Sequence, residues 1–110
     1  MKKLLAALLL APIMAHASFM DGNKLLSRFD SKMDLENTYA WGYVVGVYDS
    51  HSTVICSGGG ATVKQISDVV HKYLRENPAQ RNMDASILVL VALGNAFPCQ
   101  DNRGRKGNRS

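Results

Sequence analysis

Apolar residues recur at helical spacing in both halves of the chain. Over residues 22–29 they share one face, and Asp21 is placed to cap the helix. A second helix is expected from Leu35 to about Asp49, with Asp34 as its cap. Its aromatic and β-branched residues are also compatible with a strand. The first half of the chain is therefore predicted to form two helices, with a strand as the alternative for the second.

The second half of the chain shows two further helical segments. Residues 62–65 fit a capping box, which predicts a helix from Val63 to Asn77 that stops at Pro78. Residues 85–97 are apolar nearly all round and too numerous for a typical strand, so a helix capped by Asn82 is expected. Such a helix lies either in the centre of the core or in a subunit interface. The expected fold class is all-α, a bundle of about four helices.

The N-terminal segment has the pattern of a cleavable export signal. Lys2 and Lys3 precede an apolar run at residues 4–14, and residues 15–17 have the small-x-small pattern that signal peptidase recognises. The apolar run is shorter than the roughly 20 residues of a membrane-spanning helix. We therefore expect no membrane span and a mature chain of residues 18–110, exported to the periplasm.

The net charge is distributed unevenly along the chain. The 110 residues carry 13 basic and 9 acidic side chains, or +4, which by itself would suggest a nucleic-acid partner. Residues 1–17 hold two of the lysines, and residues 100–110 hold four basic residues against one acidic residue. Residues 18–99 are left with 7 basic and 8 acidic residues, or −1. We expect one near-neutral domain over 18–99, a basic, disordered, solvated tail over 100–110, and no nucleic-acid partner.

Cys56 and Cys99 are the two cysteines of the chain. In an oxidising compartment one intramolecular disulfide is the default. A zinc site that also uses His51 and His71 is the alternative, but neither C-x-x-C nor H-x-x-x-H spacing is present. The lack of C-x-x-C also argues against a redox-active pair. The sequence therefore predicts a disulfide that ties the bundle, with no metal and no other cofactor.

Residues with catalytic potential lie next to one another in one polar stretch. Asp49, Ser50 and His51 supply an acid, a hydroxyl and a base, but adjacency in sequence is not triad geometry, and no G-x-S-x-G motif is present. No other enzyme signature occurs, so a binder or inhibitor is expected rather than an enzyme. Gly42 and Gly46, four residues apart on the expected second helix, indicate close helix packing within the subunit or across a dimer.

Four segments in a fixed order resemble a known family. They are GNKLL at 22–26, GYVVGVYD at 42–49, ICSGG-ATVKQISDVVHKYLRENP ending at Pro78, and AFPC at 96–99. Together they resemble the Rap/Tai immunity-protein family over residues 22–99. The resemblance implies a small helical periplasmic protein, commonly a homodimer, that neutralises a peptidoglycan amidase toxin delivered by type VI secretion. Such proteins protect the producing cell from itself and its siblings.

The resemblance also implies a mechanism, in which a loop enters the toxin's cleft and blocks its catalytic Cys and His. The matching stretch is residues 49–60, and the expected contacting tip is Asp49, Ser50, His51, Ser52 and Thr53. Relatives often carry a further cysteine pair where this chain has Phe29 and Ala40. The alternative function is a periplasmic acid-stress chaperone like HdeA, which suppression of client aggregation in acid would distinguish.

Overall fold

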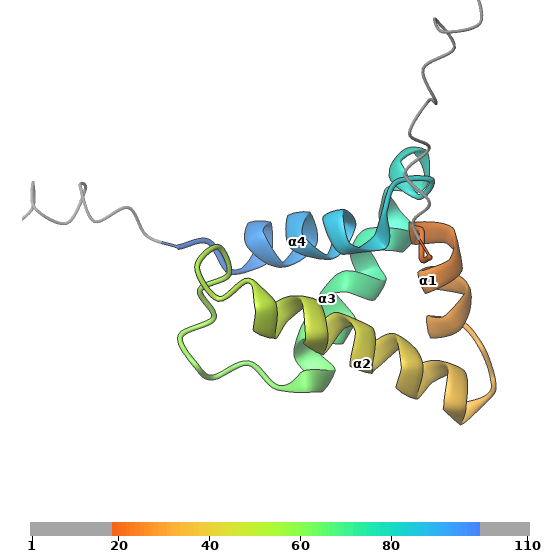
Figure 1. Cartoon of the computed structure of the whole chain (residues 1–110), viewed down its shortest axis with the longest axis horizontal. Helices are drawn as coiled ribbons and strands as arrows, with labels where there is room; N and C mark the ends of the chain where they lie inside the picture. Colours follow the sequence, from red (N-terminus) through yellow and green to blue (C-terminus); the bar gives the residue numbers. More distant parts are fainter. Residues whose placement is uncertain (1–18, 100–110) are drawn as a thin grey trace, which may run out of the picture.

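The computed structural model describes residues 19–99, which form four α-helices, one short 3-10 helix and no strand (Figure 1). The expected export signal and basic tail lie outside the described residues. The all-α class and the number of helices predicted from the sequence are confirmed. The elements are α1 (Gly22–Phe29), α2 (Asp34–Ser50), α3 (Val63–Glu76), η2 (Pro78–Gln80) and α4 (Ala85–Ala96).

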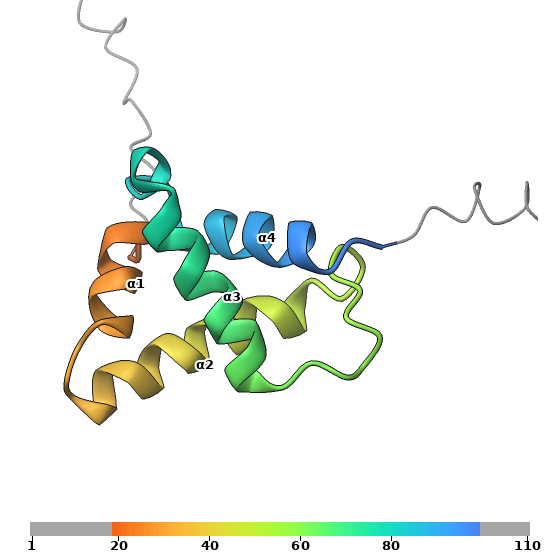
Figure 2. The same ribbon diagram turned by 180° about the vertical axis from the view of Figure 1, so that it is seen from behind.

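The four helices enclose one core. α2 and α4 lie side by side and run in the same direction, while α3 crosses behind both and α1 packs at the end where α2 and α4 begin (Figures 1 and 2). Every helix contributes fully buried aliphatic side chains, so the bundle holds together by burial of apolar surface. The largest are Leu25, Val44, Val70, Leu74, Leu88, Val89 and Leu93.

α1 begins where the sequence predicts. The Asp21 carboxylate accepts a hydrogen bond of 2.8 Å from the Lys24 amide. The first residue, Gly22, is buried against the start of α4, and a Cβ there would lie 2.5 Å from the Leu88 side chain and 2.8 Å from the Arg81 carbonyl oxygen. Only glycine fits at this contact, which joins segments far apart in the sequence.

α2 is a helix, so the strand alternative is wrong, and its cap differs from the prediction. Asp34 is the first helical residue, and the N-cap is Met33, whose side chain makes no capping hydrogen bond. The Asn37 side-chain amide instead reaches back to the carbonyl oxygens of Arg28 and Ser31, each at 2.9 Å. The turn between α1 and α2 is therefore fixed by a residue inside the following helix.

α3 has the predicted capping box at its start. The Thr62 hydroxyl accepts from the Gln65 amide at 3.1 Å, and the Gln65 side chain accepts from the Thr62 amide at 3.3 Å. The helix ends at Glu76, before Pro78, one residue earlier than predicted. This agreement reflects local rules, because both signals act within one helical turn.

α4 departs from the prediction at its start. Its N-cap is Asp84 rather than Asn82, and the amide of Ala85 donates to the Met20 carbonyl at 3.0 Å instead of to a cap. The helix is also not enclosed on all sides: one face is buried in the core, while Ile87 and Val91 on the opposite face are exposed. Within residues 19–99 no helix combines the length and apolar character needed to cross a bilayer.

Candidate functional site

The most extensive non-helical segment between α1 and α4 is residues 51–62, which we call the α2–α3 connection. It lies at the end of the molecule where α2 and α4 finish (Figures 1 and 2). Loops positioned by a rigid scaffold commonly carry binding residues. The contacts of each half of this connection therefore decide what it can present to a partner.

The structure divides the five predicted tip residues between helix and loop. Asp49 and Ser50 belong to the last turn of α2, and His51 is its C-cap. Ser52 and Thr53 lie in the turn that follows, with both side chains exposed. The amide of Val54 closes this turn by donating to the His51 carbonyl at 3.2 Å.

Ser50 and His51 make their polar contacts within the end of α2. The Ser50 hydroxyl lies 2.9 Å from the Gly46 carbonyl oxygen, and His51 Nδ1 lies 3.0 Å from the Val47 carbonyl oxygen. Nδ1 also lies 3.0 Å from the Ser50 Oγ. A carbonyl next to Nδ1 requires a proton on that nitrogen, so Nδ1 donates and does not accept a proton from the serine. The pair therefore lacks the geometry of a nucleophile and its base.

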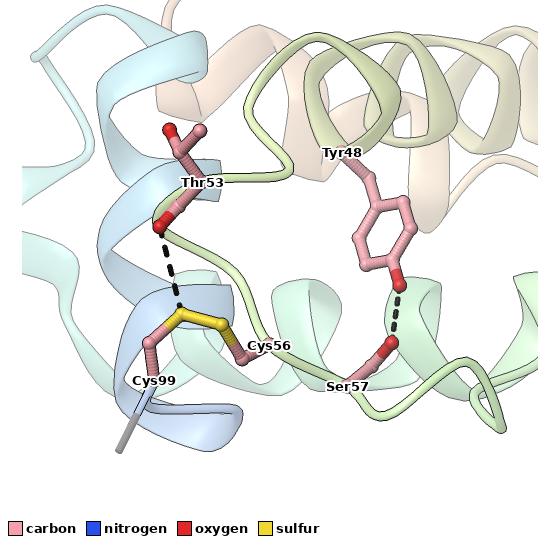
Figure 3. The surroundings of a disulfide bond; sticks show 5 residues. All are labelled: Tyr48, Thr53, Cys56, Ser57 and Cys99. Carbon is pink, nitrogen blue, oxygen red and sulfur yellow. Dashed lines mark hydrogen bonds between the residues drawn. A yellow bond between two sulfur atoms is a disulfide. The ribbon is translucent and has the colours of Figure 1, made fainter. Parts of the chain in front are cut away.

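A disulfide between Cys56 and Cys99 ties the connection to the end of α4, as predicted (Figure 3). The amide of Cys56 donates to the Phe97 carbonyl at 2.9 Å, and the Ile55 side chain is buried. Cys99 Sγ lies 3.6 Å from the Thr53 carbonyl oxygen. Because a disulfide sulfur has no proton to donate, this is a packing contact. Residues 53–56 are thus held against α4 by covalent, polar and apolar contacts.

The second half of the connection is held by α2 and then turns into α3. The Tyr48 hydroxyl is hydrogen-bonded to Ser57 Oγ (Figure 3). Gly58 and Gly59 have φ of 70° and 77°, in the left-handed region that glycine adopts without steric cost. Gly58 and Gly59 therefore form a turn between the anchored Ser57 and the start of α3.

Gly42 and Gly46 lie on the exposed side of α2. No heavy atom of another element in the described chain lies within 4 Å of the position that a Cβ would take at either glycine. Close packing within the subunit, one of the two roles predicted for them, is therefore not found. The dimer contact stays a prediction.

The exposed side of α2 continues onto α4. The Tyr43 hydroxyl lies beside Ser86 of α4, and burial raises the pKa of Tyr43 above its ordinary value of 10.0, while hydrogen bonding to Ser86 lowers it in part. Gly46 lies three residues from Tyr43 on α2, and Leu90 lies four residues from Ser86 on α4, so helical spacing puts both on the side of this contact. We define the α2–α4 face as Gly42, Tyr43, Gly46, Ile87, Leu90 and Val91, all exposed or half-buried. Tyr39 borders this face, and the Arg28 guanidinium lies over its ring, 4.1 Å from the centroid.

Phe29 and Ala40, where relatives often have a further cysteine pair, lie in different surroundings. The Phe29 ring is stacked on His71 with centroids 4.8 Å apart, and His71 Nε2 lies 2.7 Å from the Asp30 carboxylate. Ala40 is fully buried in the core. His71 therefore links α1 to α3. Residues 19–99 contain no group of three or more His, Cys, Asp or Glu side chains arranged to hold a metal ion.

These features define a class of protein: a small disulfide-tied helical scaffold that presents a fixed connection beside an uncharged face. A family model described as Rap1a immunity proteins matches residues 21–99. The chain therefore belongs to the Rap1a immunity protein family. A search of the curated proteins finds no match. Membership gives the chain an immunity role against a secreted toxin, which implies that it binds a cognate toxin.

Proposed function

We propose that the protein acts in the periplasm, where it binds a peptidoglycan amidase toxin delivered by type VI secretion and covers the toxin's active site with the α2–α3 connection. The family gives the immunity role. The observation that carries the finer proposal is the anchoring of residues 53–57 by the Cys56–Cys99 disulfide and by the Tyr48–Ser57 hydrogen bond. A segment that is ordered before binding loses less conformational entropy on association.

The disulfide also supports export. Both cysteines are exposed, and exposed disulfides persist in oxidising compartments but are reduced in the cytosol. The N-terminal signal pattern gives the route, and signal cleavage would release the mature chain from residue 18. Cell fractionation followed by mass spectrometry of the N-terminus tests this part. Full-length protein in the cytoplasm would contradict it.

A homodimer through the α2–α4 face completes the proposal. Helix α4 has no charged residue, and α2 has none between Glu36 and Asp49. Two glycines on the face leave room for the backbone of a second copy to approach closely. The face lies beside the α2–α3 connection and does not include it, so a dimer would leave both connections available to toxins.

The test of function uses the purified mature chain and peptidoglycan amidase toxins delivered by type VI secretion, with peptidoglycan as substrate. Replacing Ser52 and Thr53 together by Arg puts bulk and charge on the exposed turn while keeping the contacts of Ser50 and His51. We expect inhibition to weaken roughly 100-fold, which corresponds to the loss of a central contact.

The matched control replaces Lys72 and Glu76 of α3 by Ala. These residues form an exposed pair, with a nitrogen-to-oxygen distance of 3.9 Å, at the end of α3 that is distant from the connection. The control should inhibit like the wild type. Equal inhibition by the Ser52/Thr53 variant would show that the connection does not enter the cleft, while a wild type with no effect on the amidase would overturn the assigned toxin class.

A further inference from the structure

The α2–α3 connection presents one apolar side chain to solvent. Val54 is 53% exposed, whereas the next residue, Ile55, is 4% exposed and belongs to the core. The two side chains therefore point in opposite directions from a fixed backbone. Exposed single apolar residues are common on protein surfaces, so exposure alone assigns no role to Val54. Its setting distinguishes it from the others.

The backbone of Val54 is held on both sides. Its amide donates to the His51 carbonyl at 3.2 Å, which closes the turn. Its carbonyl oxygen lies 3.9 Å from the position that a Cβ would take on Gly94, so the turn rests against α4 where that helix has no side chain. Two residues later the disulfide fixes the chain. Val54 is thus an apolar group on a preorganised turn.

The polar groups around Val54 differ in what they can offer a partner. Ser50 and His51 already contact backbone carbonyls of α2. Ser52 and Thr53 are exposed, and within residues 19–99 neither side chain has a hydrogen-bond partner. Figure 3 shows the Thr53 side chain directed away from the disulfide. The turn therefore presents one apolar group beside two free hydroxyls.

We propose that Val54 is the anchor of the toxin contact, and that it fills an apolar subsite in the toxin's cleft while Ser52 and Thr53 meet hydrogen-bonding groups at its rim. This inference rests on the proposed function and adds a specificity-determining residue outside the predicted tip. Anchors of this kind are well packed on binding and are surrounded by contacts that exclude water. A toxin with a polar or narrower subsite would escape inhibition.

The experiment measures the affinity of the mature chain for the amidase by calorimetry. Val54→Ala removes the methyl groups that the toxin would bury, so it should weaken binding roughly 10-fold. Val54→Asp puts a charge in the apolar subsite, so it should weaken binding roughly 100-fold or more. Val54→Thr keeps the shape but adds a hydroxyl, so it should also weaken binding about 10-fold. Circular dichroism and the urea midpoint should stay near the wild-type values, because the side chain is outside the core.

The matched control is Val63→Asp. Val63 is 47% exposed at the first position of α3, beyond the other end of the connection. Its replacement should change the affinity by less than about threefold. If the wild type binds and Val54→Asp binds equally well, the anchor assignment is overturned while the proposed function stands. If the wild type does not bind any amidase tested, the proposed function fails first and the anchor assignment with it.

Discussion

Two pairs of helices divide the surface of this protein by chemistry. α1 and α3 each bury an apolar stripe and turn charged residues outward, including the exposed Lys64–Asp68 pair at 2.7 Å. α2 and α4 contain no lysine or arginine, and both leave apolar side chains exposed after the core is formed. The first pair has a surface suited to water. The second pair, with the connection that follows α2, has a surface suited to a partner.

All four helices pack on one core, but the core does not bury all of their apolar side chains. An amphipathic helix is stabilised by packing one face on the core. α4 has more apolar surface than one core contact covers, since Ile87 and Val91 lie opposite its buried face. Apolar surface shared by two adjacent helices marks a site of association more often than scattered single residues do.

The largest effect on stability is expected from removing the disulfide, which joins the connection after α2 to the end of α4. The double variant Cys56→Ser/Cys99→Ser removes a link across a sequence separation of 43. The chain-entropy relation gives a loss of about 4 kcal/mol in the free energy of unfolding. Urea unfolding of the mature chain, followed by circular dichroism, measures it. An unchanged midpoint would show that the helices are stable without the link.

A second prediction contrasts the buried stripe of α3 with the exposed side of α4. Leu74 is fully buried, so Leu74→Ala should lower the free energy of unfolding by about 3 kcal/mol through lost burial and a cavity. Val91 is 39% exposed, so Val91→Ala should lower it by about 0.5 kcal/mol or less in the monomer. Chemical denaturation at low protein concentration gives both values. Similar losses would mean that Val91 is covered in solution.

A third prediction concerns Gly46 on the exposed side of α2. An added side chain there should stabilise the monomer but weaken a dimer that packs on the α2–α4 face. In the monomer, Gly46→Ala should raise the free energy of unfolding by about 0.5 to 1 kcal/mol, since alanine favours the helix and the Cβ meets no other element. In a dimer that packs on this face, the added methyl group should weaken association. Denaturation and light scattering separate the two effects, with the exposed Arg75→Ala of α3 as control. A stabilised dimer would place the interface elsewhere.

The sequence predicted the parts of the fold that depend on neighbouring residues. The Asp21 cap and the Thr62–Gln65 capping box set the starts of α1 and α3, and both act within one turn. The caps assigned to Asp34 and Asn82 were wrong because the starts of α2 and α4 are fixed by other means. Asn37 reaches back over the preceding turn, and Ala85 donates to Met20, which is distant in sequence.

The local structure of the predicted tip was not evident from the sequence. The polar residues after Tyr48 could not show that Ser50 still belongs to the helix. Val54, which we propose as the anchor, is not among the five residues predicted for the tip. A signal was available, because Val54 and Ile55 are adjacent apolar residues in a polar segment. Because the core lies on one side of the connection, one of the two side chains is left facing solvent.

The smallest change in stability is expected for Tyr43→Phe. The pKa of Tyr43 depends on the contact between α2 and α4. Burial raises its pKa in the folded state above the ordinary value of 10.0, so the folded protein keeps this proton to higher pH than the unfolded chain does. Its contribution to stability is complete below pH 10 and is lost as the pH rises through the folded-state pKa. Tyr43→Phe should therefore lose less stability than the wild type when the pH is raised above 10.

The measurement compares urea midpoints of the wild type and Tyr43→Phe from neutral pH to above pH 10, because ionisation of every other group is shared by both proteins and cancels in the difference. Difference ultraviolet spectra give the phenol titration itself. If a second copy covers the α2–α4 face, the pKa of Tyr43 should rise further with protein concentration, since dimerisation removes more water from the hydroxyl. A titration at the ordinary value, independent of concentration, would show that neither α4 nor a partner shields this side chain.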